Sequence, residues 1–303
     1  MGNLLQEPID AIWNAPVAIE IRKTILNGSH HRCNASRCPF LAGGRPFPPA
    51  GDAEVEAALR QGLSSLPYGP KTLNLCFDGG CNLACRSCRD SSGQHVATER
   101  RRAEAIAEKV AADLASSTVE MRLSGYGDPF ASPVYSDLLR TVGPETFPAL
   151  RRLHLHTNGL LWSPGRWQQL DNLHPYLKSA EISVDAADGE TFAENRGGAS
   201  FDRLLDNLEH IAALPIRRTL SFVVQANNFR QMPAFVDLAG RFDAVAYFSQ
   251  LVNWGTFSAA EFRKRAVHRP EHPRHAEFRR ILLQVAGQPA VEAGNLLAGV
   301  CLR

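Results

Sequence analysis

Three cysteines stand close together in the segment CNLACRSC. Cys81, Cys85 and Cys88 form a CxxxCxxC spacing, and thiolates at this density are typical metal ligands. An iron–sulfur cubane normally takes four cysteine ligands. Three thiolates would therefore hold three irons and leave the fourth iron open to a ligand that is not a side chain. Gly79 and Gly80 precede the cysteines and suit a backbone that wraps closely around cluster sulfurs.

A zinc site is the alternative use of the same three cysteines. Structural zinc is usually four-coordinate, so a distant histidine such as His95 would have to complete the ligand set. The spacing favours iron–sulfur, because CxxxC is less usual than CxxC in structural zinc sites. The position in the chain favours it too, because structural zinc usually stabilises small loop-rich domains, whereas this loop opens a series of alternating strands and helices.

The chain after Lys71 alternates strand-like runs with helical ones. The first helical run has Ile106, Val110 and Leu114 on one face. Strands that alternate with helices form βαβ units, and therefore a parallel sheet with right-handed connections. The sequence predicts an α/β fold that curls into a partial or complete barrel. The predicted strands are TLNLCF (72–77), VEMRL (119–123), LRRLHLH (150–156), AEISVD (180–185), RTLSFVV (218–224) and AVAYF (244–248).

Polar and glycine-rich segments come directly after most of these strands. The cysteine segment follows the first strand, and SGYGDPF, TNG, QANN and SQLVNW follow the second, third, fifth and sixth. In a parallel barrel these loops all lie at the carboxyl face, where active sites form. We therefore expect the segments to meet at one mouth.

The composition is that of a soluble globular protein. The chain has 303 residues, of which 44% are hydrophobic and 21% charged, and a net charge of +2. This charge is too small to indicate binding to nucleic acid or to an anionic membrane. The sequence has no recognisable secretory signal or membrane-spanning run, and we expect a cytoplasmic protein. An odd number of cysteines, seven, also argues against a secreted disulfide framework.

The sequence predicts three parts. The stretch AGGRPFPPAG is typical of a linker, and helix-like runs at 259–267 and 274–286 follow the last predicted strand. We predict a small N-terminal appendage with its linker over residues 1–69, a core over 70–256 and a C-terminal helical cap over 257–303.

The segment CNLACRSC after a first strand, followed by GYGDP after a second, resembles the radical S-adenosylmethionine (radical SAM) superfamily. The resemblance covers about residues 70 to 256. It implies a partial (β/α)6 barrel in which the [4Fe–4S] cluster binds the amine and carboxylate of S-adenosylmethionine (SAM) at its open iron. It also implies an electron donor such as flavodoxin or ferredoxin.

The GYGD segment offers two glycines with little side-chain obstruction and a carboxylate that suits an ammonium group. It resembles the family's Gly-Gly-Glu-Pro element, which implies that Gly125, Tyr126, Gly127 and Asp128 bind the SAM amino group. An ordinary turn is the alternative.

Polar residues near the ends of three later strands are further candidates for SAM contacts. Ser183 and Asp185 share one face of the fourth strand and resemble the family's ribose- and carboxylate-contacting positions. A cap for the next helix is the alternative for this pair. Asn158, and Asn227 or Asn228, are candidates after the third and fifth strands, although asparagine is also a common turn residue.

Two histidines, His154 and His156, alternate on one face of the third strand. Histidine changes charge near neutral pH and can act on a substrate as an acid or a base. His156 lies nearer the mouth, so we predict it as the catalytic residue and interpret His154 as structural.

The N-terminal appendage contains Gly28, Cys33 and Cys38, preceded by a tryptophan and an arginine. This arrangement resembles the auxiliary-cluster motif of SPASM and twitch radical SAM enzymes and implies a second iron–sulfur cluster. A complete ligand set would need a further group.

The further ligand would come from Cys301, from Cys76, or from His30 or His31. A zinc knuckle with one of these histidines, or plain reduced thiols, is the alternative. We predict Cys76 as a buried small residue of the first strand.

The resemblance implies that the reduced cluster cleaves SAM to methionine and a 5′-deoxyadenosyl radical, which abstracts hydrogen from a substrate. Enzymes that modify peptides usually have an additional domain that binds the leader peptide. Residues 1 to 41 are a short segment to contain such a domain. This favours a small polyol or sugar-like substrate that is oxidised or epimerised. A peptide-modifying maturase is the first alternative, and a non-catalytic iron–sulfur or zinc protein is the second.

Overall fold

The computed structural model describes residues 2–34, 41, 51–89, 97–123 and 125–297. Its seven described strands form one parallel sheet in which each strand pairs with the next along the chain. This confirms the predicted α/β fold with a partial barrel. The strands are β1 (Thr72–Leu75), β2 (Glu120–Leu123), β3 (Arg152–Thr157), β4 (Leu177–Ser183), β5 (Arg217–Val224), β6 (Val245–Gln250) and β7 (Val291–Glu292).

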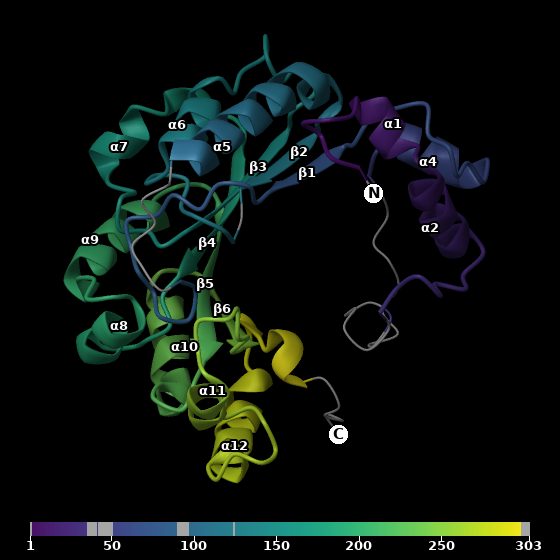
Figure 1. Cartoon of the computed structure of the whole chain (residues 1–303). Coiled ribbons are helices and arrows are strands. Elements are labelled where there is room, and N and C mark those ends of the chain that lie inside the picture. Colours follow the sequence, from purple (N-terminus) through teal and green to yellow (C-terminus); the bar gives the residue numbers. More distant parts are fainter. Residues whose placement is uncertain (1, 35–40, 42–50, 90–96, 124, 298–303) are drawn as a thin grey trace.

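Helices connect the strands and cover the outer face of the curved sheet, and its concave inner face stays open (Figure 1). Several begin at a polar side chain that caps the first turn; Ser132, for example, accepts a hydrogen bond from the Tyr135 N–H. The helices are α5 (Ala97–Lys109, continued by a π-helical turn over Val110–Leu114), α6 (Pro133–Arg140), α7 (Pro164–Gln168), α8 (Gly189–Asn195), α9 (Phe201–Ala212), α10 (Met232–Arg241), α11 (Ala259–Arg265) and α12 (His275–Ala286). Short 3-10 turns lie at Ala115–Ser117, Asp171–Leu173, Phe229–Gln231 and Gly294–Leu297.

Side chains alternate along each strand between a buried outer set and a polar inner set. In β4, Ala180 and Ile182 are buried under the helices, whereas Glu181 and Ser183 lie on the inner face and are partly exposed. The inner face of the sheet is therefore polar, as the alternation in the sequence predicts.

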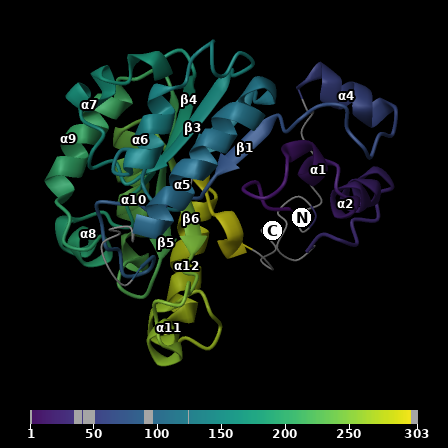
Figure 2. The ribbon, with the colours of Figure 1, turned by 45° about the horizontal axis from the view of Figure 1, so that its top comes forward.

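The N-terminal segment folds into α1 (Ile9–Trp13), α2 (Pro16–Leu26) and α4 (Ala53–Arg60), which lie beside the β1 edge of the sheet (Figures 1 and 2). Arg22 holds this segment together. Its guanidinium lies 4.4 Å from the centre of the Trp13 ring, and it donates to the carbonyls of Trp13 at 2.7 Å and Ser64 at 3.2 Å. Gly28 follows α2 with a φ of 71°, a conformation that favours glycine.

The C-terminal region differs from prediction in one respect. The helices predicted at 259–267 and 274–286 are present as α11 and α12, but β7 also pairs with β6 there. None of the described helices is long and apolar enough to cross a lipid bilayer.

The stability of the sheet should depend on its aromatic core. Phe222 is 0% exposed and its ring lies 4.8 Å from that of Phe235. We expect Phe222→Ala to lower the free energy of unfolding by about 3–5 kcal/mol because it leaves a cavity. Leu283→Ala, at a 47% exposed position of α12, is the control and should change it by less than about 0.5 kcal/mol. Urea unfolding measures both, and equal effects would contradict the assignment of the core.

Candidate cofactor site

The cysteine loop follows β1 directly, at the carboxyl end of the sheet. Its backbone turns tightly at the second cysteine, because the N–H groups of Cys88 and Arg89 both donate to the Cys85 carbonyl at 2.9 and 3.0 Å. Cys85 is buried, Cys81 is half-buried and Cys88 is exposed. All three thiols line one cavity.

Each of the three thiols has a polar side chain beside it. Asn158 Nδ2 lies 3.8 Å from Cys81 Sγ, Arg196 Nη1 lies 3.8 Å from Cys85 Sγ, and Arg89 Nη2 lies 3.7 Å from Cys88 Sγ. Burial raises the pKa of the Cys81 thiol above its usual value. Donors next to the sulfurs favour the thiolate form that binds iron.

The GYGD loop packs against the cysteine loop from the other side. The Asp128 N–H donates to the Gly80 carbonyl at 2.7 Å. The Asp128 carboxylate is 1% exposed and accepts from the Phe130 N–H at 2.9 Å, the Thr157 hydroxyl at 2.7 Å and the Asn158 N–H at 2.8 Å. Burial raises its pKa, and these donors oppose that shift. Asp128 thus ties the loop after β2 to the end of β3.

Asp128 and the two glycines of the loop also line the cavity, whereas Tyr126 does not and is 51% exposed. The predicted contact of this loop with the SAM amino group stays a prediction. The structure adds a second role, because Asp128 already has three protein donors.

Ser183 lies on the inner face of the sheet and lines the same cavity. Asp185, two residues later, departs from the strand alternation because its φ is 64° and its side chain is only 3% exposed. Its carboxylate accepts from the Val223 N–H at 2.6 Å and pairs with Arg196 at 2.8 Å. Its carboxylate therefore faces protein donors, and its role in SAM binding stays a prediction.

The cavity also brings in His156 and Asn158 from the end of β3. His156 Nε2 lies 2.8 Å from Ser183 Oγ and 3.6 Å from a Glu181 oxygen. His154 does not line the cavity and contacts Ser179 at 2.8 Å, and burial lowers its pKa. The catalytic role of His156 and the structural role of His154 stay predictions.

Two other predicted residues lie apart from the cavity. Asn227 is exposed and donates to the Asn195 side chain at 2.9 Å, while the neighbouring Asn228 is buried and donates to the carbonyls of Asp185 and Val223. Cys76 is exposed, so its prediction as a buried residue was wrong. It directly follows β1 and alternates with the buried Leu75, so it lies on the inner side of the sheet.

The N-terminal cysteines are only partly described. Cys33 is half-buried in a turn after α2, in which its N–H donates to the His30 carbonyl at 2.8 Å. Cys38 and Cys301 lie outside the described residues, as does His95. A second metal site near Cys33 therefore stays a prediction.

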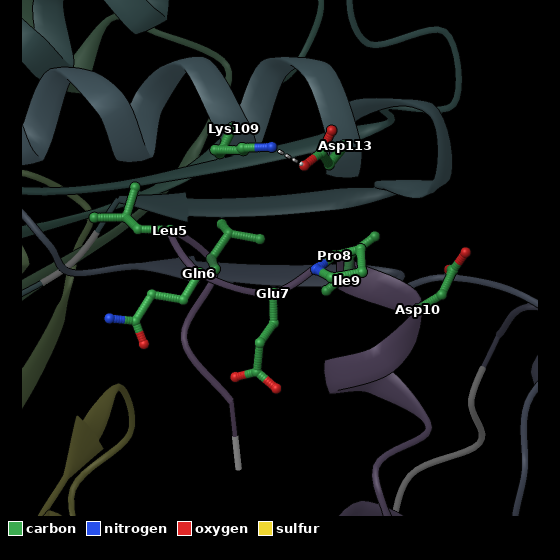
Figure 3. A pocket seen from close by; sticks show the side chains of 9 residues that line it. Leu5, Gln6, Glu7, Pro8, Ile9, Asp10, Lys109 and Asp113 are labelled. Carbon is green, nitrogen blue, oxygen red and sulfur yellow. Dashed lines mark hydrogen bonds and ion pairs between the residues drawn. The ribbon is translucent and has the colours of Figure 1, made fainter.

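A second, larger cavity of about 600 Å³ lies between the N-terminal segment and the end of α5. Figure 3 shows Lys109 and Asp113 paired across one side of it, at 3.1 Å, with Glu7 pointing away from them. Among the described residues, no cysteine and none of the site residues predicted from the sequence lines it.

The cysteine cavity fits a [4Fe–4S] cluster better than a single ion. Among the described residues, no three His, Cys, Asp or Glu side chains converge as ligands of one metal ion. A cubane does not require such convergence, because each thiolate binds a different iron at a separate corner. Three thiols with a polar donor beside each, around one cavity, suit such a cluster with one open iron.

Sequence reasoning did not find Arg196 as part of this site. It reaches Cys85 from the end of α8, across 111 positions of sequence. The sequence around it has no spacing that links it to the cysteine loop.

The family model described as the Radical SAM superfamily matches residues 76–239, more than half of the chain. Among curated proteins, none matches the sequence significantly.

Among solved structures, Streptococcus suis SuiB bound to S-adenosylmethionine is 14% identical, with a TM-score of 0.50, over 92% of this chain and 61% of its own. Native anSMEcpe with bound AdoMet is 17% identical, with a TM-score of 0.45, over 60% of this chain and 51% of its own. SuiB bound to the precursor peptide SuiA is 16% identical, with a TM-score of 0.44, over 77% of this chain and 52% of its own. The chain thus spans between half and two thirds of these solved chains, and at such identities the likeness shows the fold alone.

The close packing of the GYGD loop against the cysteine loop should depend on Gly127. Gly127 has a φ of 79°, and a Cβ there would lie 2.2 Å from the Asp78 carbonyl oxygen. We expect Gly127→Ala to displace the cysteine loop and to reduce the iron bound after anaerobic reconstitution at least twofold. Gly143→Ala, with nothing within 4 Å of the added Cβ, should bind iron as the wild type does. Equal iron contents would show that the close approach is not needed.

Proposed function

This chain belongs to the radical SAM superfamily, and we propose that it modifies a peptide held over the inner face of the sheet. The observation that carries this proposal is the cavity in which three cysteine thiols lie together with the inner-face groups His156 and Ser183. The family's cofactors are a [4Fe–4S] cluster and SAM. When bound, the reduced cluster supplies the electron that cleaves SAM to methionine and the 5′-deoxyadenosyl radical that abstracts hydrogen from the substrate.

Residues of the chain would bind the cluster and line the cavity for SAM. Cys81, Cys85 and Cys88 would hold three irons of the cluster and would leave the fourth iron for SAM. The loop that Asp128 anchors lines the same cavity as the cysteines, with Gly125 and Gly127 at its wall. Backbone groups without side chains let a ligand approach closely.

His156 is the residue that we propose for proton transfer to or from the substrate. Its side chain is 25% exposed, lies on the inner face of the sheet and lines the cofactor cavity. Ser183 and Glu181 contact Nε2 and orient the ring. A histidine held in this way is within reach of a substrate to accept or supply a proton.

The proposal of a peptide substrate has two supports. SuiB, whose fold this chain shares, was also solved with its precursor peptide. Large apolar side chains are exposed on loops after the strands, including Trp254 at 75%, Tyr126 at 51% and Val252 at 40%. Exposed apolar groups suit a substrate that brings apolar groups of its own, as a peptide does and a polyol does not. The polyol or sugar substrate predicted from the sequence has no such support.

The N-terminal segment is part of this proposal as the site of a second iron–sulfur cluster. The packing of Arg22 against Trp13 and the conformation of Gly28 fix the chain just before Cys33. Cys33 and Cys38 would be two of the ligands, and flavodoxin or ferredoxin would be the electron donor to the enzyme.

Cluster binding and SAM cleavage are tested together by removing thiols. Anaerobically reconstituted wild type should contain about four irons for one cluster or about eight for two, and should form 5′-deoxyadenosine with SAM and dithionite. Cys85→Ala should lose both the cluster and the product. A wild-type protein with a full cubane that forms no 5′-deoxyadenosine would refute the proposed reaction.

The second cluster is tested by the double variant Cys33→Ala/Cys38→Ala. It should lower about eight irons to about four and keep the SAM-cleaving cluster. The same iron content as the wild type would remove the auxiliary site from the proposal.

The substrate class is tested by adding candidate substrates to the reconstituted enzyme with SAM and reductant. A short peptide encoded beside the gene should raise the yield of 5′-deoxyadenosine severalfold and should change in mass. Stimulation by sugars or polyols without any effect of the peptide would favour the polyol prediction instead.

A further inference from the structure

Arg196 places a buried cation beside a cluster ligand. Its side chain is only 11% exposed, and every one of its nitrogens has a protein partner. Nη1 lies 3.8 Å from Cys85 Sγ, Nη2 lies 2.8 Å from Asp185 Oδ2, and Nε donates to the Val184 carbonyl at 3.4 Å. These three contacts hold the guanidinium in one position beside the Cys85 thiol.

Asp185 is the residue that fixes this position. It adopts a left-handed backbone conformation, which is unfavourable for a residue with a side chain. Its surroundings impose that conformation, because the Asn195 and Asn228 side chains both donate to its carbonyl, at 3.1 and 2.9 Å. The Val223 N–H holds its other carboxylate oxygen at 2.6 Å. The carboxylate therefore points at Arg196 and not along the strand face.

The end of α8 also approaches the cysteine loop closely. Gly197 follows Arg196 with a φ of 62°, and a Cβ there would lie 3.0 Å from the Ala84 carbonyl oxygen. This glycine lets the backbone beside Arg196 pack directly on the residue before Cys85. Backbone packing and the ion pair with Asp185 thus bring Arg196 to the same thiol.

We propose that Arg196, positioned by Asp185, raises the reduction potential of the [4Fe–4S] cluster through its contact with the Cys85 thiolate. One-electron reduction adds a negative charge to the cluster and its thiolates. A cation that donates to a thiolate stabilises the reduced state more than the oxidised one, and it does so strongly where water is excluded. This inference rests on the cluster of the proposed function, but not on its substrate.

The test measures the cluster itself, without SAM or substrate. Wild type and variants are reconstituted, matched for iron content, and titrated with reductant while the reduced cluster is followed by electron paramagnetic resonance. We expect Arg196→Gln to lower the equilibrium constant for reduction at least tenfold, which is 59 mV for one electron. Asp185→Asn keeps an oxygen that can accept from the guanidinium but removes the negative charge that offsets it, and should therefore shift the potential in the opposite direction, upwards.

Arg86→Gln is the matched control. Arg86 lies between Cys85 and Cys88 in the sequence, and its side chain is 65% exposed and pairs with Glu261 at 2.8 Å. Arg86→Gln removes one positive charge, as Arg196→Gln does, but from an exposed position. We expect it to change the equilibrium constant for reduction by less than twofold. An equal shift in this variant would refute a specific role of Arg196.

Two results would overturn the inference. One is an unchanged potential in Arg196→Gln at full iron content, and weaker SAM binding in that variant would then assign Arg196 to SAM. The other applies if the Gln variant fails to hold a cluster: it is a potential in Asp185→Asn that does not rise above that of the wild type. A wild type that binds no cluster would instead be a failure of the proposed function.

Discussion

The buried carboxylate of Asp128 is the interaction on which the cofactor site depends. It accepts from Phe130, Thr157 and Asn158, and its own N–H donates to Gly80. These bonds join the cysteine loop, the loop after β2 and the end of β3. A carboxylate that is 1% exposed is stable only when donors replace the water that it has lost. The same donors therefore stabilise the carboxylate and hold together the loops that line the cysteine cavity.

The parallel sheet limits which side chains can reach this site. Inner-face residues follow one another every second position, so each step towards the mouth is about 6.6 Å. This is why His156 lines the cavity and His154, two residues earlier on the same face, does not. The outer residues of the same strands, such as Leu153 and Leu155, are fully buried under helices and are unavailable for chemistry. Position along the strand, and not residue type, separates the two histidines.

Local patterns in the sequence predicted most of the sheet and the residues that follow each strand, because strand alternation and turn composition are local properties. They did not predict β7, since a strand of two residues, Val291–Glu292, has no period to detect. They misplaced Cys76, because the alternation of β1 does not say which face helices will cover. They missed Arg196, whose contact with Cys85 depends on how α8 packs against a loop far away in the sequence.

The donors beside the three thiols come from three different parts of the fold. Asn158 follows β3, Arg196 follows α8 and Arg89 belongs to the cysteine loop itself. The electrostatic effect of each donor depends on its surroundings, and we expect it to be largest at Cys85, the most buried of the three thiols. The packing of α8 and the end of β3 therefore enters directly into the electronic environment of the cluster. A substitution that moves either element should act on the cluster without touching a cysteine.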